Sequence, residues 1–259
     1  MQAQDGIAAD LAVRARSSGL TVGDLEAARI EERTVVRTWA MRGTLHLVAT
    51  EDLDWLLPLL GPRFVAAGRR RRAELGLDEE TSVRAVYALR DILANHGPLT
   101  RTELAAQLDT RGIHTEGQAA IHLIYRAALE GVVCLGPDRS SKSTYVLLED
   151  WVQRGPGMPP DTAREMMARR YMEAYAPAGP EDLASWCGLA MSEVRTAWQA
   201  IAKALVEVEI RTRPAWIIKG RAEWLDGAPA HGPIVRLLPR FDTYLLGYRS
   251  RELAVASQY

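Results

Sequence analysis

The residues best suited to chemistry in this 259-residue chain are amides, guanidinium groups and imidazoles. Gln2 and Gln4 stand two positions apart, and a glutamine amide offers both hydrogen-bond donors and an acceptor. Chain starts are usually frayed, so this spacing alone does not separate a ragged end from a catalytic pair. The five histidines show no metal-binding spacing and no His-Glu-x-x-His occurs, so we expect neither a metal nor a cofactor.

A second group of candidates is basic. Arg63 is followed by Arg69, Arg70, Arg71 and Arg72 in "GPRFVAAGRRRRAELG". Such a cluster can contact phosphates, or it can be a solvated helix end where arginine complements the helix dipole. The net charge of the chain is −1, so a nucleic-acid partner needs a local basic surface. Taken alone, these residues favour the solvated helix end.

The composition limits the class of protein. The chain is 47% hydrophobic and 25% charged, which is typical of a globular protein. No stretch reaches the roughly 18 apolar residues that cross a bilayer, so we expect no membrane association. Cys134 and Cys187 each stand alone among apolar residues, which predicts buried thiols in a reducing, cytoplasmic compartment.

A weak internal repeat supplies the elements that must position these groups. Two capping-box patterns, Thr100-x-x-Glu103 and Thr115-x-x-Gln118, predict one helix to about residue 108 and another to Gly131. Residues 132–136 and 144–150 then read as two strands. With a preceding helix over about 81–95, this is the element order of a winged helix.

The order recurs along the chain. Helices over about 160–175 and 191–204 precede strands at 206–210 and 214–220, around Arg211 and Thr212. Near the start, a helix capped by Thr21-x-x-Asp24 precedes strands in "TVVRTW" and "TLHLV". The sequence therefore predicts a mainly α protein with small β-hairpins, an α+β class. Its expected winged-helix modules are 1–75 (without its first helix), 76–155 and 156–226, followed by the incomplete start of a β-rich segment at 227–259.

The second helix of each helix-turn-helix would face outward, where such a helix can enter a DNA major groove. The candidates are Gln118, His122 and Arg126 in the middle module and Arg195, Gln199 and Lys203 in the third. These side chains can reach phosphates or base edges. Outward helix faces are polar in any protein, and winged helices also bind proteins, so the fold alone does not decide the function.

Three stretches together resemble one family. They are "QAQ" at 2–4, "RTWAMRGTLHLV" at 37–48 and "LLPRFDTYLLGYR" at 237–249. They are similar to the winged-helix DNA glycosylases of the AlkZ type, and the resemblance covers nearly the whole chain. It implies that Gln2 and Gln4 are the catalytic Gln-x-Gln motif of an enzyme that excises alkylated purines or unhooks interstrand crosslinks.

The resembling stretches add three candidates for DNA contact. His46 is either a half-buried strand histidine or a site residue, and Arg42 lies in a turn where a phosphate contact fits. Asp242 is either a turn residue that caps the local backbone or part of the site. Asp5 follows the glutamines directly, without an assigned role.

The resemblance implies a monofunctional glycosylase that hydrolyses an N-glycosidic bond, with alkylated or crosslinked double-stranded DNA as its partner. We expect a monomer, located in the cytoplasm at the nucleoid. Family members have a helix before the motif and continue beyond Arg249, so we expect this chain to be truncated at both ends and its activity to be impaired. The alternatives are a non-catalytic winged-helix DNA-binding protein or transcription regulator, and an interaction scaffold without DNA affinity.

Overall fold

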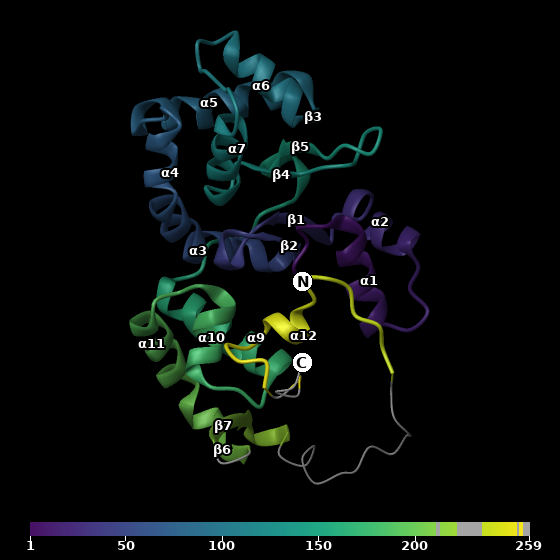
Figure 1. The fold of residues 1–259 in the computed structure, drawn as a ribbon, viewed down its shortest axis with the longest axis vertical. Coiled ribbons are helices and arrows are strands. Elements are labelled where there is room, and N and C mark those ends of the chain that lie inside the picture. Colours follow the sequence, from purple (N-terminus) through teal and green to yellow (C-terminus); the bar gives the residue numbers. More distant parts are fainter. Residues whose placement is uncertain (211–212, 222–234, 253, 256–259) are drawn as a thin grey trace. The chain divides into compact units, whose positions relative to one another are not determined.

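Helices and small antiparallel sheets form two units in this computed structural model, as Figure 1 shows. The structure describes residues 1–210, 213–221, 235–252 and 254–255. One unit is residues 19–157, and the other joins residues 1–18 to residues 158–259. These units cut across the four predicted segments, and the division into three winged-helix modules stays a prediction.

The unit of residues 19–157 alternates helices with short strands. In chain order these are α2 (Val22–Ile30), β1 (Val35–Trp39), η1 (Met41–Gly43), β2 (Leu45–Ala49), η2 (Thr50–Asp52), α3 (Leu53–Ala67), α4 (Arg69–Glu74), α5 (Glu79–His96), β3 (Leu99–Thr100), α6 (Arg101–Asp109), α7 (Ala119–Leu129), β4 (Val133–Leu135), β5 (Thr144–Leu147) and α8 (Leu148–Trp151).

One sheet runs through this unit. Its strand order is β2-β1-β4-β5-β3 and every pair is antiparallel. Strand β1 meets β4 where Arg37 lies opposite Leu135. The hairpins expected in the first two modules therefore belong to a single sheet.

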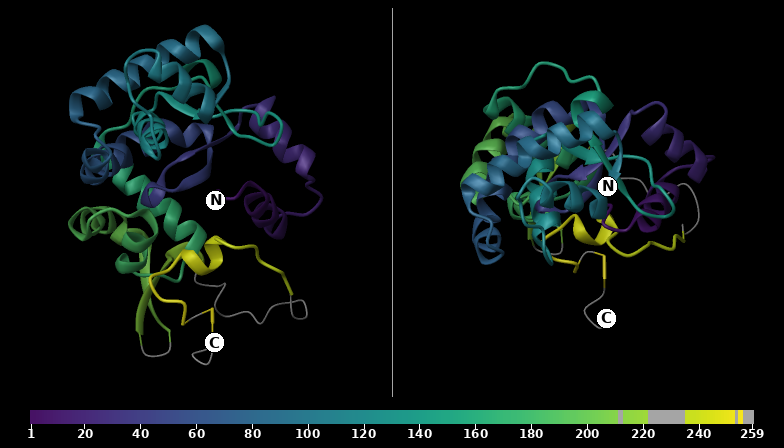
Figure 2. Two further views of the ribbon diagram at one scale, coloured as in Figure 1. Left: turned by 45° about the horizontal axis from the view of Figure 1, so that its top comes forward. Right: turned by 90° about the horizontal axis from the view of Figure 1, so that it is seen from above.

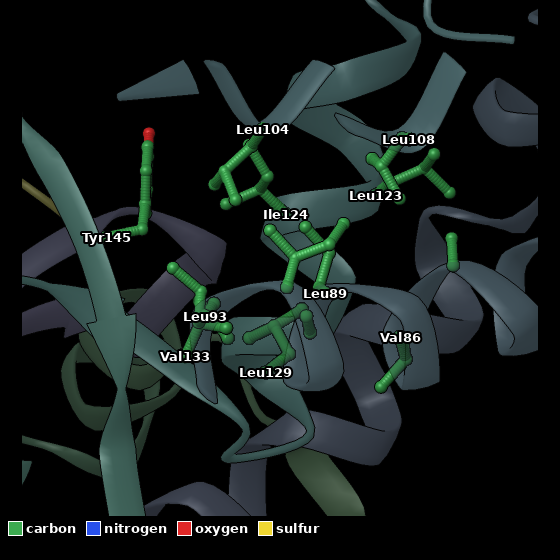
Figure 3. Packing of buried hydrophobic residues seen from close by; sticks show 14 of the residues in the cluster. Val86, Leu89, Leu93, Leu104, Leu108, Leu123, Ile124, Leu129, Val133 and Tyr145 are labelled. Atoms are coloured by element: carbon green, nitrogen blue, oxygen red, sulfur yellow. The ribbon is translucent and has the colours of Figure 1, made fainter. Parts of the chain in front are cut away.

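The core of this unit lies where α5, α6 and α7 meet. Figure 3 shows side chains from all three helices together with Val133 of β4 and Tyr145 of β5. The fully buried helical residues include Leu89, Leu104, Leu108, Leu123 and Ile124. Burial of this apolar stripe is the main force that stabilises helices of this length.

Two of the predicted capping boxes are confirmed and one is wrong. The side chains of Thr21 and Thr100 cap α2 and α6, and in each box the acidic residue three positions later bonds back to the cap backbone. Thr115 instead bonds to the Asp109 carboxylate, through its backbone nitrogen and its hydroxyl at 3.0 Å each. These bonds tie Thr115 to the C-terminal end of α6, and α7 begins later, at Ala119, without a side-chain cap.

In its described residues, the second unit is mainly helical with one hairpin. Its elements are α1 (Gly6–Arg16), α9 (Pro160–Tyr175), α10 (Pro180–Cys187), α11 (Met191–Ile201), η3 (Ala202–Ala204), β6 (Leu205–Ile210), β7 (Arg213–Ile218) and α12 (Thr243–Leu246). Figure 2 shows β6 and β7 as an antiparallel hairpin that follows the three helices. The turn expected at Arg211 and Thr212 lies outside the described residues.

The segment predicted to be β-rich carries a short helix. Residues 235–252, the main described part of 227–259, contain α12 and no strand, while 227–234, 253 and 256–259 lie outside the described residues. Side-chain bonds hold this segment: the Tyr171 hydroxyl donates to the Gly247 carbonyl at 2.8 Å, and the Tyr248 hydroxyl donates to the Tyr175 carbonyl at 2.7 Å. Long-range contacts with α9 thus override the local preference for strand.

Candidate functional site

Gln2 and Gln4 form a hydrogen-bonded pair directly before α1. The Gln2 Nε2 atom donates to the Gln4 Oε1 atom at 2.5 Å. Gln2 is 7% exposed and Ala3 is fully buried, whereas Gln4 is exposed. The pair therefore joins an amide inside the protein to an amide that solvent reaches.

This arrangement can hold and orient a water molecule. An amide oxygen has two lone pairs, and the bond from Gln2 uses one of those on Gln4 Oε1. The second lone pair can accept a hydrogen bond from water. Because Gln2 fixes the rotation of the Gln4 amide, the direction of that second acceptor is set as well.

Asp5, for which the sequence suggested no role, connects the pair to its helix. Its carboxylate accepts from the Ala8 backbone nitrogen at 3.0 Å and so caps α1. It also pairs with the Arg240 guanidinium. The Ala8 bond and then the Arg240 bond lower the pKa of Asp5. The sequence did carry a signal for this cap: Asp5 stands just before alanines at positions 8, 9 and 12, whose spacing fits one face of a helix. We did not predict α1 from it.

Asp242 lies inside the fold. Its side chain is 1% exposed and accepts from both terminal nitrogens of Arg16, at 2.6 and 2.8 Å. It also accepts from the Tyr244 backbone nitrogen at 2.7 Å and caps α12. Burial opposes ionisation of Asp242, yet the Arg16 bonds hold its pKa below the usual value. The structure favours the capping role over the expected DNA contact, because the carboxylate is enclosed and neutralised.

The turn between β1 and β2 presents Arg42. This residue has φ 56°, a left-handed conformation that is uncommon for side-chain-bearing residues. Its neighbour Gly43 has φ 63°, and a Cβ at that position would collide with the Tyr125 hydroxyl. The Ala40 backbone nitrogen closes the turn by donating to the Thr44 carbonyl at 3.0 Å. Arg42 remains partly exposed, as a phosphate contact requires.

His46 is buried on β2 and is 1% exposed. Its Nδ1 atom lies 2.9 Å from the Thr44 carbonyl oxygen, which can only accept, so Nδ1 carries the proton and donates. Its Nε2 atom is buried without a hydrogen-bond partner among the described residues. Burial, reinforced by the Arg42 charge, lowers the pKa of His46 to about 3. His46 is therefore a neutral imidazole whose Nε2 can accept a hydrogen bond.

The arginine run meets the start of α7. The Arg71 Nη2 atom donates to the Gln118 Oε1 atom at 2.8 Å. Burial, followed by the charges of Arg71 and Arg72, lowers the pKa of His122. Arg69 and Arg70 are exposed on α4, and Arg63 is exposed on α3. The Arg71–Gln118 bond places the arginine run beside the start of α7, while Arg70 and Arg71 also pair with Glu74 at 3.0 and 3.2 Å. We define the basic surface as Arg69, Arg70, Arg71, Gln118 and His122.

Arg126, expected on an outward face, and Arg72 of the arginine run are both buried. Arg126 is 4% exposed and pairs with Glu79 and Glu130, at 2.7 Å each. Arg72 is 2% exposed and donates to the Val65 carbonyl at 2.9 Å. The outward placement of Arg126 was wrong because Glu79 of α5 covers that side of α7, a contact that helical spacing does not reveal. By contrast, the three candidates of the third module, Arg195, Gln199 and Lys203, are exposed as expected.

Other expectations concern metals, membranes and thiols. Within the ranges that the structure describes, no cluster of three or more His, Cys, Asp or Glu residues is arranged to hold a metal ion. No helix in the described part of the chain has the length and apolar character of a membrane span. Cys134 and Cys187 are buried, as predicted, and burial raises the pKa of the Cys134 thiol to about 12.

Three comparisons agree on the kind of protein. A family model described as "DNA glycosylase AlkZ-like" matches residues 1–259. The "Interstrand DNA cross-link repair glycosylase" of Streptomyces sahachiroi is 31% identical over 248 residues, which are 87% of this chain and 63% of that protein. This chain thus spans less than two thirds of the relative's length. The solved structure of Streptomyces sahachiroi DNA glycosylase AlkZ has a TM-score of 0.81 and 26% identity over all of this chain and 72% of that one. The expected α+β fold class is confirmed, and the chain belongs to the AlkZ-like DNA glycosylase family.

Proposed function

We propose that this protein is a DNA glycosylase that hydrolyses the N-glycosidic bond of N7-alkylated purines, as single adducts or within interstrand crosslinks. The observation that carries the proposal is the bonded pair of Gln2 and Gln4, with one amide buried and the other open to solvent. The relative whose printed name is an interstrand crosslink repair glycosylase supports the substrate class.

Weak catalytic groups suit this reaction. An N7-alkylated purine is cationic, so its bond to the sugar breaks with the electron pair going to the base, which leaves neutral. The sugar carbon C1′ gains positive charge and takes the oxygen of a water, and the water releases one proton. The products are a free base and an abasic site. The enzyme needs to place the water and favour positive charge, and amide oxygens provide both.

DNA contact is assigned to two places in the unit of residues 19–157. The basic surface defined above presents exposed guanidinium groups suited to phosphates. Arg42 lies in the turn before β2, and His46, on β2 itself, is a neutral hydrogen-bond acceptor. We propose that the protein acts on double-stranded DNA as a monomer, in the cytoplasm at the nucleoid, and that the reaction requires water but no cofactor.

The test uses duplex DNA that carries N7-alkylguanine, as a single adduct and as an interstrand crosslink. The full chain is incubated with each duplex in enzyme excess, and alkali then cleaves the abasic sites. We expect strand breaks above the spontaneous rate with the unaltered chain. Gln4→Ala and Gln2→Ala should each lower the excision rate by about 100-fold, the scale at which a misplaced reactant is penalised.

Gln153→Ala is the matched control, because Gln153 is an exposed glutamine away from both proposed regions in sequence. It should excise at the rate of the unaltered chain. Breaks that are equally frequent in the Gln4→Ala chain would remove the glutamines from the mechanism. Salt-sensitive DNA binding without breaks on either duplex would favour the alternative, a non-catalytic DNA-binding protein or transcription regulator.

A further inference from the structure

Residues 240–243 contact both ends of the helix that carries the glutamine motif. Asp242 accepts two hydrogen bonds from Arg16 in the last turn of α1, and Arg240 pairs with Asp5 at its first turn. Thr243 Oγ1 also lies 3.5 Å from the Met1 sulfur atom. A segment 226 residues further along the chain thus holds α1 at its start and at its end.

The contact at Arg16 is the strong one. Its two hydrogen bonds are parallel and charge-assisted, and the carboxylate that receives them is 1% exposed. Loss of Arg16 would leave the buried Asp242 charge without its partner, and loss of the Asp242 charge would remove both charge-assisted bonds that hold Arg16. Asp5 and Arg240 form an exposed pair, and such pairs contribute little.

Few large apolar side chains of helix α1 are buried. It has 11 residues, and an isolated helix of that length is marginal in water. Its buried side chains are the small residues Ala8, Ala9 and Ala12, whereas Ile7 and Leu11 are 75% and 53% exposed. Little buried apolar area therefore holds α1 in position, and the ion pair between Arg16 and Asp242 contributes correspondingly more.

We propose that residues 240–243 position the catalytic motif, with Arg16 and Asp242 as the positioning residues that hold α1 and hence Gln2 and Gln4. The inference rests on the proposed function for its kinetic effect and on the fold alone for its structural effect. Neither residue has to meet DNA for this role, because the Asp242 carboxylate is enclosed by Arg16 and the start of α12. Reaction geometry is sensitive to displacements of about 1 Å, so a loosened helix slows chemistry before it weakens binding.

The kinetic test compares Asp242→Asn with the unaltered full chain on the N7-alkylguanine duplex. The single-turnover excision rate should fall at least about tenfold, while the Kd for the same duplex stays within about threefold. Glu252→Gln is the control, because Glu252 and Arg213 form an ion pair of 2.8 Å in the same unit but with both side chains exposed. It should change neither value. An unchanged excision rate in Asp242→Asn, or a rate loss explained by weaker binding, would overturn the inference.

Backbone hydrogen exchange gives a second readout that does not need activity. In Asp242→Asn, amides of residues 6–16 should lose protection while those of α9 keep it, because only α1 is released. Arg16→Lys keeps the charge but loses the bidentate bond, so it should show the same loss of protection in weaker form. It is the variant to measure if Asp242→Asn fails to fold. Unchanged exchange at α1 in both variants would refute the anchor. If the unaltered chain excises no base, the proposed function fails, and the exchange pattern alone decides whether the anchor stands.

Discussion

At the residue scale, burial decides what His46 can do. A free imidazole titrates near neutral pH and can pass a proton in either direction. Inside the fold, desolvation lowers the pKa of His46 to about 3 and Thr44 fixes the proton on Nδ1. The residue is therefore a neutral imidazole with a buried acceptor at Nε2, and it is unsuited to acid catalysis.

The depressed pKa predicts how stability depends on pH. Between about 3 and the ordinary value of 6.5 the unfolded chain binds a proton at this position and the folded chain does not. His46 therefore carries no penalty above pH ~6.5, and it destabilises the fold increasingly as the pH falls toward ~3. Because of this group, the free energy of unfolding at about pH 5 is lower than at about pH 8 by about 2 kcal/mol.

Urea unfolding at these two pH values checks the prediction. His46→Gln should reduce the acid-induced loss in the free energy of unfolding by about 2 kcal/mol, because glutamine does not titrate. His114→Gln, a change at an exposed histidine of the same unit, should leave the loss as it is. Equal acid sensitivity of the unaltered and His46→Gln chains would show that His46 charges normally in the folded state.

At the element scale, the turn between β1 and β2 depends on a close approach. Two consecutive residues, Arg42 and Gly43, have positive φ angles, and the second lies against Tyr125 of α7. A side chain at position 43 would overlap the Tyr125 hydroxyl. The glycine thus lets the turn that carries Arg42 dock on α7.

Gly43→Ala should destabilise the protein by about 1–3 kcal/mol, from backbone strain together with overpacking against Tyr125. Tyr125→Phe removes the oxygen that an alanine methyl group at position 43 would meet, so the double variant should recover part of the loss. Denaturant unfolding of both single variants and the double variant measures this coupling. Gly19→Ala is the control, since Gly19 has φ 83° but no atom within 4 Å of its Cβ position; a loss as large as that of Gly43→Ala would attribute the whole effect to strain.

At the scale of the whole molecule, the chain builds one unit from a continuous segment and the other from two separated segments. Residues 19–157 contain all five strands of the larger sheet and the core shared by α5, α6 and α7. The second unit needs residues 1–18 as well as 158–259, because α1 bonds to the segment that contains Asp242. The glutamine motif therefore depends on chain that follows it at a long distance.

This difference predicts that residues 19–157 fold when expressed alone. A continuous segment of that length with its own buried core is within the usual size of a domain. Far-UV circular dichroism should show helix, and thermal unfolding should be cooperative. The segment 158–259 alone should unfold less cooperatively than the same segment mixed with a peptide of residues 1–18. A molten 19–157 fragment would show that the two units do not fold separately.

The sequence by itself determined the family, most of the helices and the chemical types in the site. Capping boxes at Thr21 and Thr100, apolar stripes and the paired strands are local signals, carried by residues within a few positions of one another. The glutamine motif was recognisable because three separated stretches matched one family together. Buried thiols at Cys134 and Cys187 also followed from their apolar neighbours.

Only the tertiary structure decided what surrounds these groups. Arg126 has the spacing of an outward residue, yet Glu79 and Glu130 enclose it. Asp242 finds Arg16 across 226 residues, a distance over which no periodic pattern in one sequence carries information. His46 stays neutral because of the environment that folding assembles around it. Burial and charge pairing depend on elements far apart in the chain, and they separate the side chains that can contact DNA from those that hold the fold.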